Sequence, residues 1–291
     1  MIKGVNILFF FLTSNFLFGQ YIPSFTAFME TDLLYNPSVS GNKECLSSMM
    51  GYRSQWVGVD GAPNYFIFST SLPTKNSSIG MGLNFLNESI GANRNNLITA
   101  NLSYRFLVSH GVLSFGLSGG VKNINYNNDL VEVSNSSDPV FLIGSRSYYN
   151  PYFGFGTSYK VNNLFFGIAI ADISNQNFSE DLTLSFNYKY EVNKELILTS
   201  YVFYKNGLSK ISQMEMGCAM DYNKKVGLYL GFRTNQDILL GLRLGLTEQI
   251  FLFYCYDFIT KYYAGYTGGT HEFILKYNLI EEKQANNPRD F

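Results

Sequence analysis

The most constraining feature of this chain is an alternation of apolar and polar side chains that recurs along most of its length. In T-L-S-F-N-Y-K-Y-E (residues 183–191), apolar or aromatic side chains occupy every second position and polar side chains the others. A period of two places the two sets on opposite faces of a strand. One such strand fits any half-buried sheet. Its repetition, with short turns between alternate copies, favours a membrane β-barrel with an apolar face toward lipid and a polar face toward the lumen.

The connections between the strand-like segments alternate in length. Residues 109–111 and 223–224 form tight connections, whereas residues 127–147 and 261–270 form long ones. This sorting is typical of outer-membrane barrels, which have short periplasmic turns and longer extracellular loops. The sequence therefore predicts an all-β fold, a transmembrane antiparallel outer-membrane β-barrel of about 14 strands. The predicted strands are residues 46–57, 64–72, 79–88, 96–108, 112–126, 148–160, 164–173, 182–192, 195–205, 211–222, 225–234, 238–247, 249–259 and 271–279.

Composition and charge agree with a barrel and exclude other classes. Charged residues are only 15% of the chain, against about 25% in a typical soluble domain. The net charge is −1, so there is no basic field to attract nucleic acid. Beyond the first residues no apolar run reaches the length of a spanning helix, so the chain crosses a membrane as strands or not at all. The lipid of the outer membrane is its expected surrounding.

The two ends of the chain differ from the barrel pattern. Residues 1–19 read as a signal peptide, with Lys3 before an apolar run and Gly19 before a cleavage site. A short membrane anchor is the alternative, but polar residues interrupt a run that is already too short to span. We expect residues 20–45 to be an irregular lead-in that plugs or skirts the barrel, residues 46–279 to be the barrel, and residues 280–291 to be a periplasmic tail.

Several basic side chains fall on the predicted inner face of the barrel. We expect them to pair with Glu88, Glu191 or Glu272 and with water; a ring that selects solutes is the alternative. Glycines on the same face would relieve crowding inside a closed sheet. The inward basic residues are Arg53, Arg105, Lys122, Lys189, Arg233, Arg243 and Lys276.

No motif for catalysis, cofactor binding or metal binding stands out. The two histidines, His110 and His271, have no cluster of other metal ligands nearby in the sequence, and the three cysteines are far apart. Nucleophile elbow, P-loop and zinc-protease motifs are absent from the sequence. We therefore predict no cofactor, no metal and no enzymatic activity. A catalytic site in the lumen is the alternative, but no set of catalytic residues in the sequence supports it.

Several stretches resemble one known family, PorP/SprF, the outer-membrane components of the type IX secretion system of gliding and related Bacteroidetes-type bacteria. The most specific is Y-R-S-Q-W-V-G-V-D-G-A-P, and the resemblance spans nearly the whole mature chain. The sequence departs from the family where residues 38–40 are Ser-Val-Ser rather than the frequent Ala-Tyr-Ala, and where Cys45 precedes the first strand. The matching stretches are residues 34–41, 52–63, 79–83, 113–117, 137–141, 151–156, 269–279 and 287–291.

The resemblance implies a non-enzymatic barrel that supports secretion or cell-surface attachment of specific cargo proteins, such as adhesins and gliding proteins. It also implies periplasmic lipoprotein and OmpA-like partners from the secretion system, together with a secreted cargo protein. A passive porin or small-solute channel is the alternative function.

Partner or cargo contacts are expected where the alternation stops. The first block is residues 52–63. A role in the fold is the alternative for it, with Trp56 as an interfacial anchor, Gly61 as a turn former and Pro63 as a rigid strand start. The tail would dock in a partner groove or remain an unstructured terminus. The candidates are Arg53, Gln55, Trp56, Asp60, Gly61 and Pro63 in the first block, Asp138 and Pro139 in the long loop, and Asn287, Pro288, Arg289, Asp290 and Phe291 in the tail.

Overall fold

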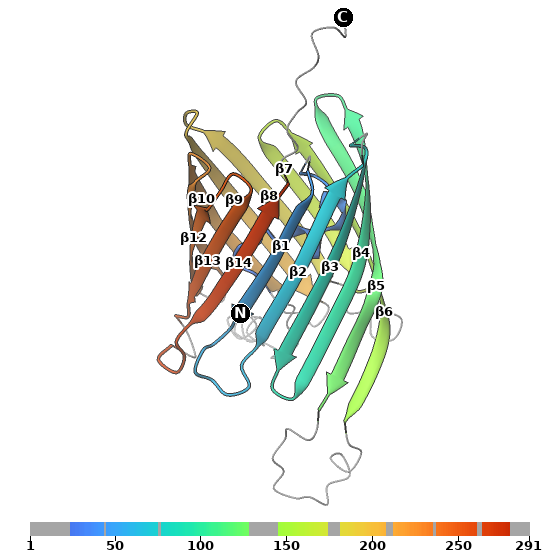
Figure 1. Ribbon diagram of the computed structural model, residues 1–291, viewed down its shortest axis with the longest axis vertical. Coiled ribbons are helices and arrows are strands. Elements are labelled where there is room, and N and C mark those ends of the chain that lie inside the picture. Colours follow the sequence, from blue (N-terminus) through green and yellow to red (C-terminus); the bar gives the residue numbers. More distant parts are fainter. Residues whose placement is uncertain are drawn as a thin grey trace, which may run out of the picture.

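A computed structural model describes residues 24–43, 45–74, 77–127, 145–173, 181–207, 212–234, 237–260 and 264–279. In this part of the chain fourteen antiparallel strands close into one barrel, because each pairs with its sequence neighbours and β1 pairs with β14 (Figure 1). The predicted fold class and strand number are confirmed. The strands are β1 (Ser47–Ser54), β2 (Asn64–Pro73), β3 (Ile79–Ile90), β4 (Asn93–Val108), β5 (Gly111–Tyr126), β6 (Arg146–Val161), β7 (Leu164–Ala171), β8 (Asp181–Glu191), β9 (Leu196–Gly207), β10 (Ser212–Tyr222), β11 (Val226–Arg233), β12 (Asp237–Gly245), β13 (Ile250–Phe258) and β14 (Thr270–Asn278).

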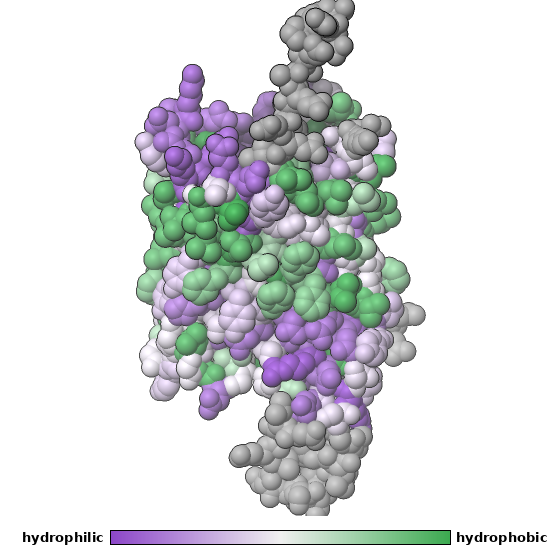
Figure 2. Space-filling model, viewed as in Figure 1, coloured by the Kyte–Doolittle hydropathy of each residue, from purple (hydrophilic) through white to green (hydrophobic). Residues whose placement is uncertain are grey.

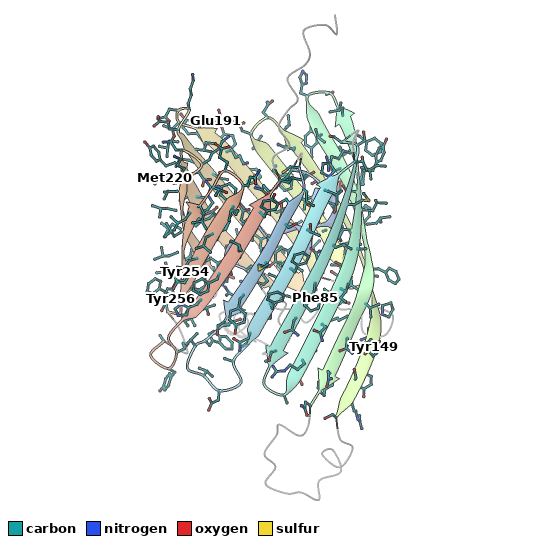
Figure 3. The ribbon with its side chains drawn as sticks, viewed as in Figure 1. Phe85, Tyr149, Glu191, Met220, Tyr254 and Tyr256 are labelled. Carbon is teal, nitrogen blue, oxygen red and sulfur yellow. The ribbon has the colours of Figure 1, made fainter. Side chains whose placement is uncertain are left out.

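The outer face of the barrel is apolar. Leu102 is 52% exposed, Leu117 61% and Ile98 59%, although each lies in the middle of a strand. Figure 2 shows hydrophobic residues gathered across the middle of one face, between more hydrophilic regions toward the two ends. Side chains such as Tyr149 and Met220 project outward from the wall (Figure 3). Such a band is the surface that a barrel presents to lipid. No helix in the described residues is long and apolar enough to span a membrane.

The two ends of the barrel carry different connections. The end that we call the turn rim has the short connections 109–110, 162–163 and 223–225, and the end that we call the loop rim has the long connections 127–145 and 259–269. Some connections at the loop rim are also short: residues 234–236 join β11 to β12, and β3 and β4 continue past the predicted ends of their strands to a turn at Gly91, whose φ is +53°.

The extended β3–β4 hairpin is held by polar side chains. Asn95 Nδ2 donates to Glu88 Oε2 at 2.6 Å, and Asn87 Nδ2 donates to Asn96 Oδ1 at 2.8 Å. The sequence predicted a loop only for residues 89–95, because these residues lack the apolar alternation on which the strand assignment rested.

A plug, which we define as residues 24–43, occupies the lumen before the chain enters β1. It contains a short helix, α2 (Asp32–Tyr35), and a 3₁₀ turn, η1 (Pro37–Val39). Phe25 is fully buried, and Phe28 stacks on Phe203 of β9 with ring centroids 4.8 Å apart. The described part of the lead-in therefore lies inside the barrel, where it packs against the wall as the core of a soluble domain would.

Candidate functional site

Two arginines and three carboxylates form a buried ion cluster in the lumen. Arg53 of β1 contacts Asp257 of β13 at 2.6 Å and Glu272 of β14 at 3.0 Å. Arg233 of β11 contacts the same Asp257 at 2.9 Å and Glu215 of β10 at 2.9 Å. Each of these side chains is at most 2% exposed. Charges so far from solvent are stable only when they are paired and hydrogen-bonded, so the five groups act as a unit.

The plug supplies hydrogen-bond donors that complete this cluster. The backbone N–H groups of Thr26 and Ala27 donate to the two oxygens of Glu272 at 2.9 and 3.1 Å. The Thr26 hydroxyl donates to Asp257 Oδ1 at 2.5 Å and accepts from Arg53 Nη1 at 3.2 Å. Because three carboxylates face two guanidinium groups, these donors stabilise the excess negative charge. The plug therefore stabilises the buried charges of the barrel wall.

The sequence predicted the inward position of some members of this cluster but not of the others. Arg53, Arg233 and Glu272 were predicted to point inward, and they do. The predicted pairing through Glu272 is present, but Glu88 is bound by Asn95 and Glu191 is exposed at the turn rim. The partners that sequence reasoning missed are Glu215, Asp257, Thr26 and, at 3.9 Å from Arg233, Asp237. A single acidic residue inside an aromatic strand, as in I-F-L-F-Y-C-Y-D-F, was the available signal.

Three of the other predicted inward basic residues have acidic partners, whereas Lys189 is exposed near the turn rim. Lys122 lies 2.6 Å from Asp172, and Arg243 lies 3.0 Å from Asp221. Lys276 pairs with Glu30 of the plug. These three residues are paired as expected, but with Asp172, Asp221 and Glu30 rather than with the predicted partners Glu88, Glu191 and Glu272.

The opposite wall holds the plug through glycines. A Cβ at Gly116 of β5 would overlap the backbone of Pro37 and Ser38, and one at Gly156 of β6 would overlap the side chain of Asn36. The Asn36 Oδ1 accepts from Ser38 N at 3.0 Å and so caps η1. The N-P-S-V-S-G segment thus lies directly against strand backbone, which only glycine permits.

Hydrogen bonds fix the end of the plug near the turn rim. The Ser40 carbonyl accepts from Ser103 Oγ and from Arg105 Nη2, each at 2.8 Å. A Cβ at Gly80 of β3 would overlap this same carbonyl group. Close approach and hydrogen bonding therefore act on the same short stretch of chain.

Two neighbouring plug carboxyls have opposite pKa shifts. Burial raises the pKa of Asp32 above its ordinary value of 3.8. Burial also acts to raise the pKa of Glu30, but the ammonium groups of Lys276 and Lys43 outweigh it and hold the pKa well below 4.5. Glu30 is therefore ionised at neutral pH and anchors the plug to β14.

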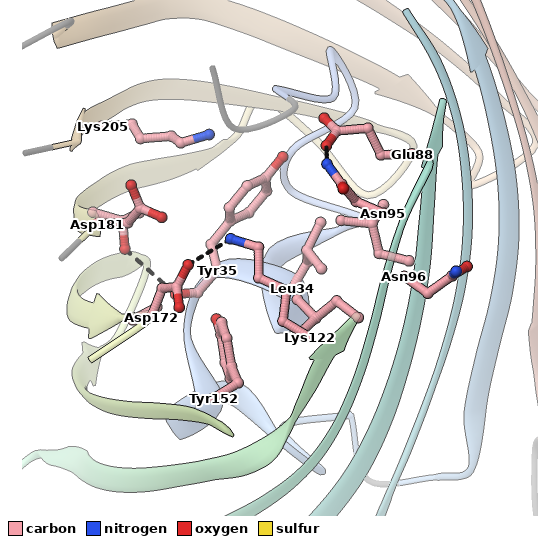
Figure 4. Close-up of a pocket in the computed structure, with 14 residues that line it drawn as sticks. Leu34, Tyr35, Glu88, Asn95, Asn96, Lys122, Tyr152, Asp172, Asp181 and Lys205 are labelled. Carbon is pink, nitrogen blue, oxygen red and sulfur yellow. Dashed lines mark hydrogen bonds and ion pairs between the residues drawn. The ribbon is translucent and has the colours of Figure 1, made fainter. Parts of the chain in front are cut away.

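A cavity of about 100 Å³ lies between the plug and the loop rim (Figure 4). Leu34 and Tyr35 of the plug line it on one side. The Glu88 Oε1 and Asn95 Oδ1 atoms, also in its lining, are buried and have no hydrogen-bond partner among the described residues. The charged residues that line it are Glu88, Lys122, Asp172, Asp181 and Lys205.

The predicted first block is divided between the lumen and the loop rim. Arg53 is 1% exposed in the ion cluster, which gives it a role inside the barrel. The Gln55 N–H donates to the Pro63 carbonyl at 2.9 Å, which closes the base of the loop. Trp56 has a positive φ of 52°, and Asp60 is exposed at the tip.

Neighbouring connections support this loop. The Gly61 carbonyl accepts from Gly91 N at 2.9 Å, and Val57 exchanges backbone hydrogen bonds with Gly268 and Gly269 at 2.7 and 2.9 Å. The loop is therefore a defined surface. Its role in partner contact stays a prediction.

The remaining candidates lie outside the described residues. Asp138 and Pro139 fall within 128–144, and Asn287, Pro288, Arg289, Asp290 and Phe291 fall within 280–291. The signal peptide lies within residues 1–23, which are likewise outside the description. Within the described ranges, no group of three or more His, Cys, Asp or Glu side chains could hold a metal ion.

Solved structures with a similar fold are outer-membrane proteins. The Ralstonia pickettii toluene transporter TbuX has a TM-score of 0.53 at 9% identity, covering 87% of this chain and 94% of its own. The Acinetobacter baumannii outer membrane protein Omp33 has a TM-score of 0.51 at 8% identity, covering 81% and 99%. The Pseudomonas putida toluene transporter TodX has a TM-score of 0.51 at 9% identity, covering 85% and 93%. At these identities the likeness shows the fold alone.

Sequence comparison gives a more specific result. No curated protein matches this sequence. A family model, described as type IX secretion system membrane protein PorP/SprF, matches residues 17–277.

Proposed function

The chain belongs to the PorP/SprF family of type IX secretion system membrane proteins and is located in the outer membrane, and we propose that it is a non-enzymatic barrel that supports secretion or surface attachment of specific cargo proteins. Family membership implies partner components of the secretion system in general. The proposal adds periplasmic lipoprotein and OmpA-like partners and a secreted cargo protein, such as an adhesin or a gliding protein.

The observation that carries the proposal is the plug in the lumen. Phe25, Phe28 and Tyr35 fill space that a passive channel would leave to water, and the ion cluster around Arg53 fixes the plug from one side. A barrel filled in this way offers surfaces rather than a pore. This supports a role in protein–protein contact over passive transport.

The two rims supply surfaces for different partners. By the usual orientation of outer-membrane barrels, the turn rim faces the periplasm and the loop rim faces the outside. We assign secretion components to the turn rim and the tail, and cargo to the loop rim. On that rim the contact candidates are Gln55, Trp56, Asp60, Gly61, Pro63, Asp138 and Pro139.

The experiment that tests the function compares the surface proteins of the host with and without this gene. We expect one or a few proteins to lose their surface location in the deletion strain and to regain it when the wild-type gene is restored. Brief protease treatment of intact cells with mass spectrometry measures this. An unchanged set of surface proteins would contradict the proposal.

A second experiment addresses the porin alternative. The purified protein in a planar lipid bilayer should give no stable single-channel current, whereas a variant lacking residues 24–31 should conduct, because it lacks Phe25 and Phe28, which fill the lumen. Sustained conductance by the wild-type protein, of the same size as that of the variant, would favour the porin.

A third experiment concerns the tail. Deletion of residues 287–291 should remove one or more periplasmic proteins from those that co-purify with the barrel. If the set of co-purifying proteins is unchanged, the tail is not a docking element.

A further inference from the structure

The barrel wall has an uneven edge at the loop rim. β5 and β6 pair along their whole length, from Gly111↔Val161 to Tyr126↔Arg146. β7 is shorter, and its pairing with β6 covers only residues 155–161. The β5–β6 hairpin therefore extends beyond its neighbour, as its lower position in Figure 1 shows.

The exposed side of β6 directs unpaired backbone groups toward the place where β7 would continue. The Ile173 N–H donates to the Phe153 carbonyl at 3.2 Å, so Phe153 faces the β7 side. Because successive residues of an antiparallel strand face alternate neighbours, Ser147, Tyr149 and Pro151 face this side too. Among the described residues no strand pairs with them there.

Pro151 supports this assignment of the open side. In its register position opposite Val121, a residue that faced β5 would need an N–H for the ladder. Proline has none, and within sheets it is confined to edges and bulges. It therefore lies where a donor toward β5 is not required.

The cavity described above lies directly behind this edge. Tyr152 of β6 lines it, together with Asp172 and Asp181, which follow β7 and begin β8 (Figure 4). The buried acceptors Glu88 Oε1 and Asn95 Oδ1 are without a hydrogen-bond partner in the described part of the chain. Acceptors of this kind are stabilised by N–H donors, and best by a cation.

We propose that the β6 edge from Ser147 to Pro151 and the cavity behind it form one peptide-binding site. An extended polypeptide segment adds to β6 as a strand, and one of its inward side chains, a Lys or Arg, enters the cavity toward Glu88 and Asn95. The inference rests on the proposed function in one respect: the segment belongs to the exported cargo.

The alternation of β6 determines what the segment looks like. Outward positions lie beside Tyr149, which is 74% exposed and projects from the wall in Figure 3, and beside Phe153, which is 54% exposed. Inward positions meet the cavity. Main-chain hydrogen bonds of an added strand give affinity, and its alternate side chains give specificity. The recognised segment therefore alternates apolar residues with polar ones that include a Lys or Arg.

The test measures binding of a synthetic peptide to the purified full-length barrel. The probe is a fluorescein-labelled peptide of sequence T-V-K-V-T-V-T, and fluorescence anisotropy gives its dissociation constant. We expect it to bind about tenfold more tightly than a copy with Glu in place of Lys, and than a copy N-methylated on alternate amides. Equal binding of all three peptides would overturn the proposal.

Two substitutions at one position separate the edge from the aromatic ring. Tyr149→Pro removes the N–H that faces the open side and should weaken binding about tenfold, while Tyr149→Ala retains that N–H and should weaken it about twofold at most. Equal effects of the two variants would show that the backbone edge is not the contact. The altered mobility of the folded barrel in unheated gels confirms folding of both.

The cavity is tested in the same way. Glu88→Gln should reduce the preference for Lys over Glu in the peptide by about tenfold, whereas Glu248→Gln, an exposed control at the turn rim, should leave it unchanged. An unchanged preference in Glu88→Gln would remove the cavity from the site. Because the peptide assay uses purified protein, its failure beside a positive gene-deletion result would refute the edge site and leave the secretion function standing.

Discussion

The two sides of the lumen hold the same plug by different means. On the side of β10, β11, β13, β14 and β1, buried charges such as Arg53 and Asp257 bind the plug through its N–H and hydroxyl groups. On the side of β3 to β6, Gly116 and Gly156 let the plug backbone lie against the strands, and the charged group at the contact, Arg105, donates to the neutral Ser40 carbonyl. The first side therefore holds the plug mainly through hydrogen bonds to buried charges, and the second holds it mainly through close packing against glycines.

The difference matters for how the plug could be released. A buried charge left without its partner is strongly unfavourable, so withdrawal of residues 24–31 would leave Glu272 without two donors. Withdrawal of residues 36–40 from the glycines would lose packing and a few hydrogen bonds. The charged side should therefore be the tighter of the two. Amide hydrogen exchange, which reports each segment separately, can measure this.

The largest effect is expected from breaking the ion cluster. Arg53→Met removes the arginine partner of Glu272 and one of the two arginine partners of Asp257, and should lower the free energy of unfolding by about 4 kcal/mol. Urea unfolding in lipid vesicles, followed by the fluorescence of Trp56, the one tryptophan in the chain, measures the change.

The matched readout for Arg53→Met is exchange of the Thr26 and Ala27 amides. These should lose protection, while the Ser40 amide should keep it, because Ser40 is held by the opposite wall. Equal loss of protection at both places would show that the two sides do not act separately.

The second effect concerns the pH dependence of the plug. The folded pKa of Glu30 lies below its ordinary 4.5, so its contribution to stability is complete above pH 4.5 and is lost as the pH falls through the folded pKa. The folded pKa of Asp32 lies above its ordinary 3.8, so its contribution has the opposite sign: it favours folding at low pH and is lost as the pH rises through the folded pKa.

Variants of these two carboxyls should therefore behave oppositely. Glu30→Gln should lower the free energy of unfolding by about 2 kcal/mol at neutral pH, because it removes the charged partner of Lys276. It should also flatten the loss of stability between pH 5 and pH 3. Asp32→Asn should make that loss steeper. Urea unfolding over this pH range measures both, and parallel curves for the two variants would contradict the assignment.

The third effect should come from adding a methyl group to a glycine that contacts the plug, on the side of the lumen formed by β3 to β6. Gly116→Ala places a methyl group where the plug backbone lies and should cost about 2 kcal/mol, with loss of amide protection at residues 38–40. Gly119→Ala, three residues along the same strand, is the control, since nothing lies within 4 Å of its added methyl. A similar cost for both variants would mean that β-strand propensity, rather than contact with the plug, determines the effect.

The architecture could be predicted from the sequence because the alternation of apolar and polar residues within each strand is a local pattern. Leu184 and Thr183 take opposite faces on the evidence of their immediate neighbours, and the same holds for the inward position of Arg53. The partners of Arg53 could not be predicted, since Asp257 is a partner only because β13 and β1 lie near each other in the closed barrel. The sequence around Thr26 contains no pattern that predicts its position in the lumen beside the ion cluster.

Other features escaped prediction for related reasons. The β3–β4 hairpin continues beyond the predicted strand ends, through residues 89–95, and Asn95, which pairs with Glu88, does not follow the pattern used to find strands. The open edge of β6 depends on the length of β7, and the predicted β7, residues 164–173, extended two residues beyond Ala171. Sequence periodicity thus determines which residues face inward, but not what they meet.

The smallest effect is expected at the cap of η1, on the glycine side. Asn36→Ala removes the side-chain oxygen that accepts from Ser38 N and should cost about 1 kcal/mol, the usual loss for a cap. Because the same side chain fills the space above Gly156, the double variant Asn36→Ala with Gly156→Ala should recover part of the cost that Gly156→Ala alone incurs. Urea unfolding of the four proteins in this cycle measures the coupling. Costs that simply add would mean that Asn36 caps the turn without defining the contact at Gly156, and the contrast between the two sides of the lumen would then rest on Gly80 and Gly116.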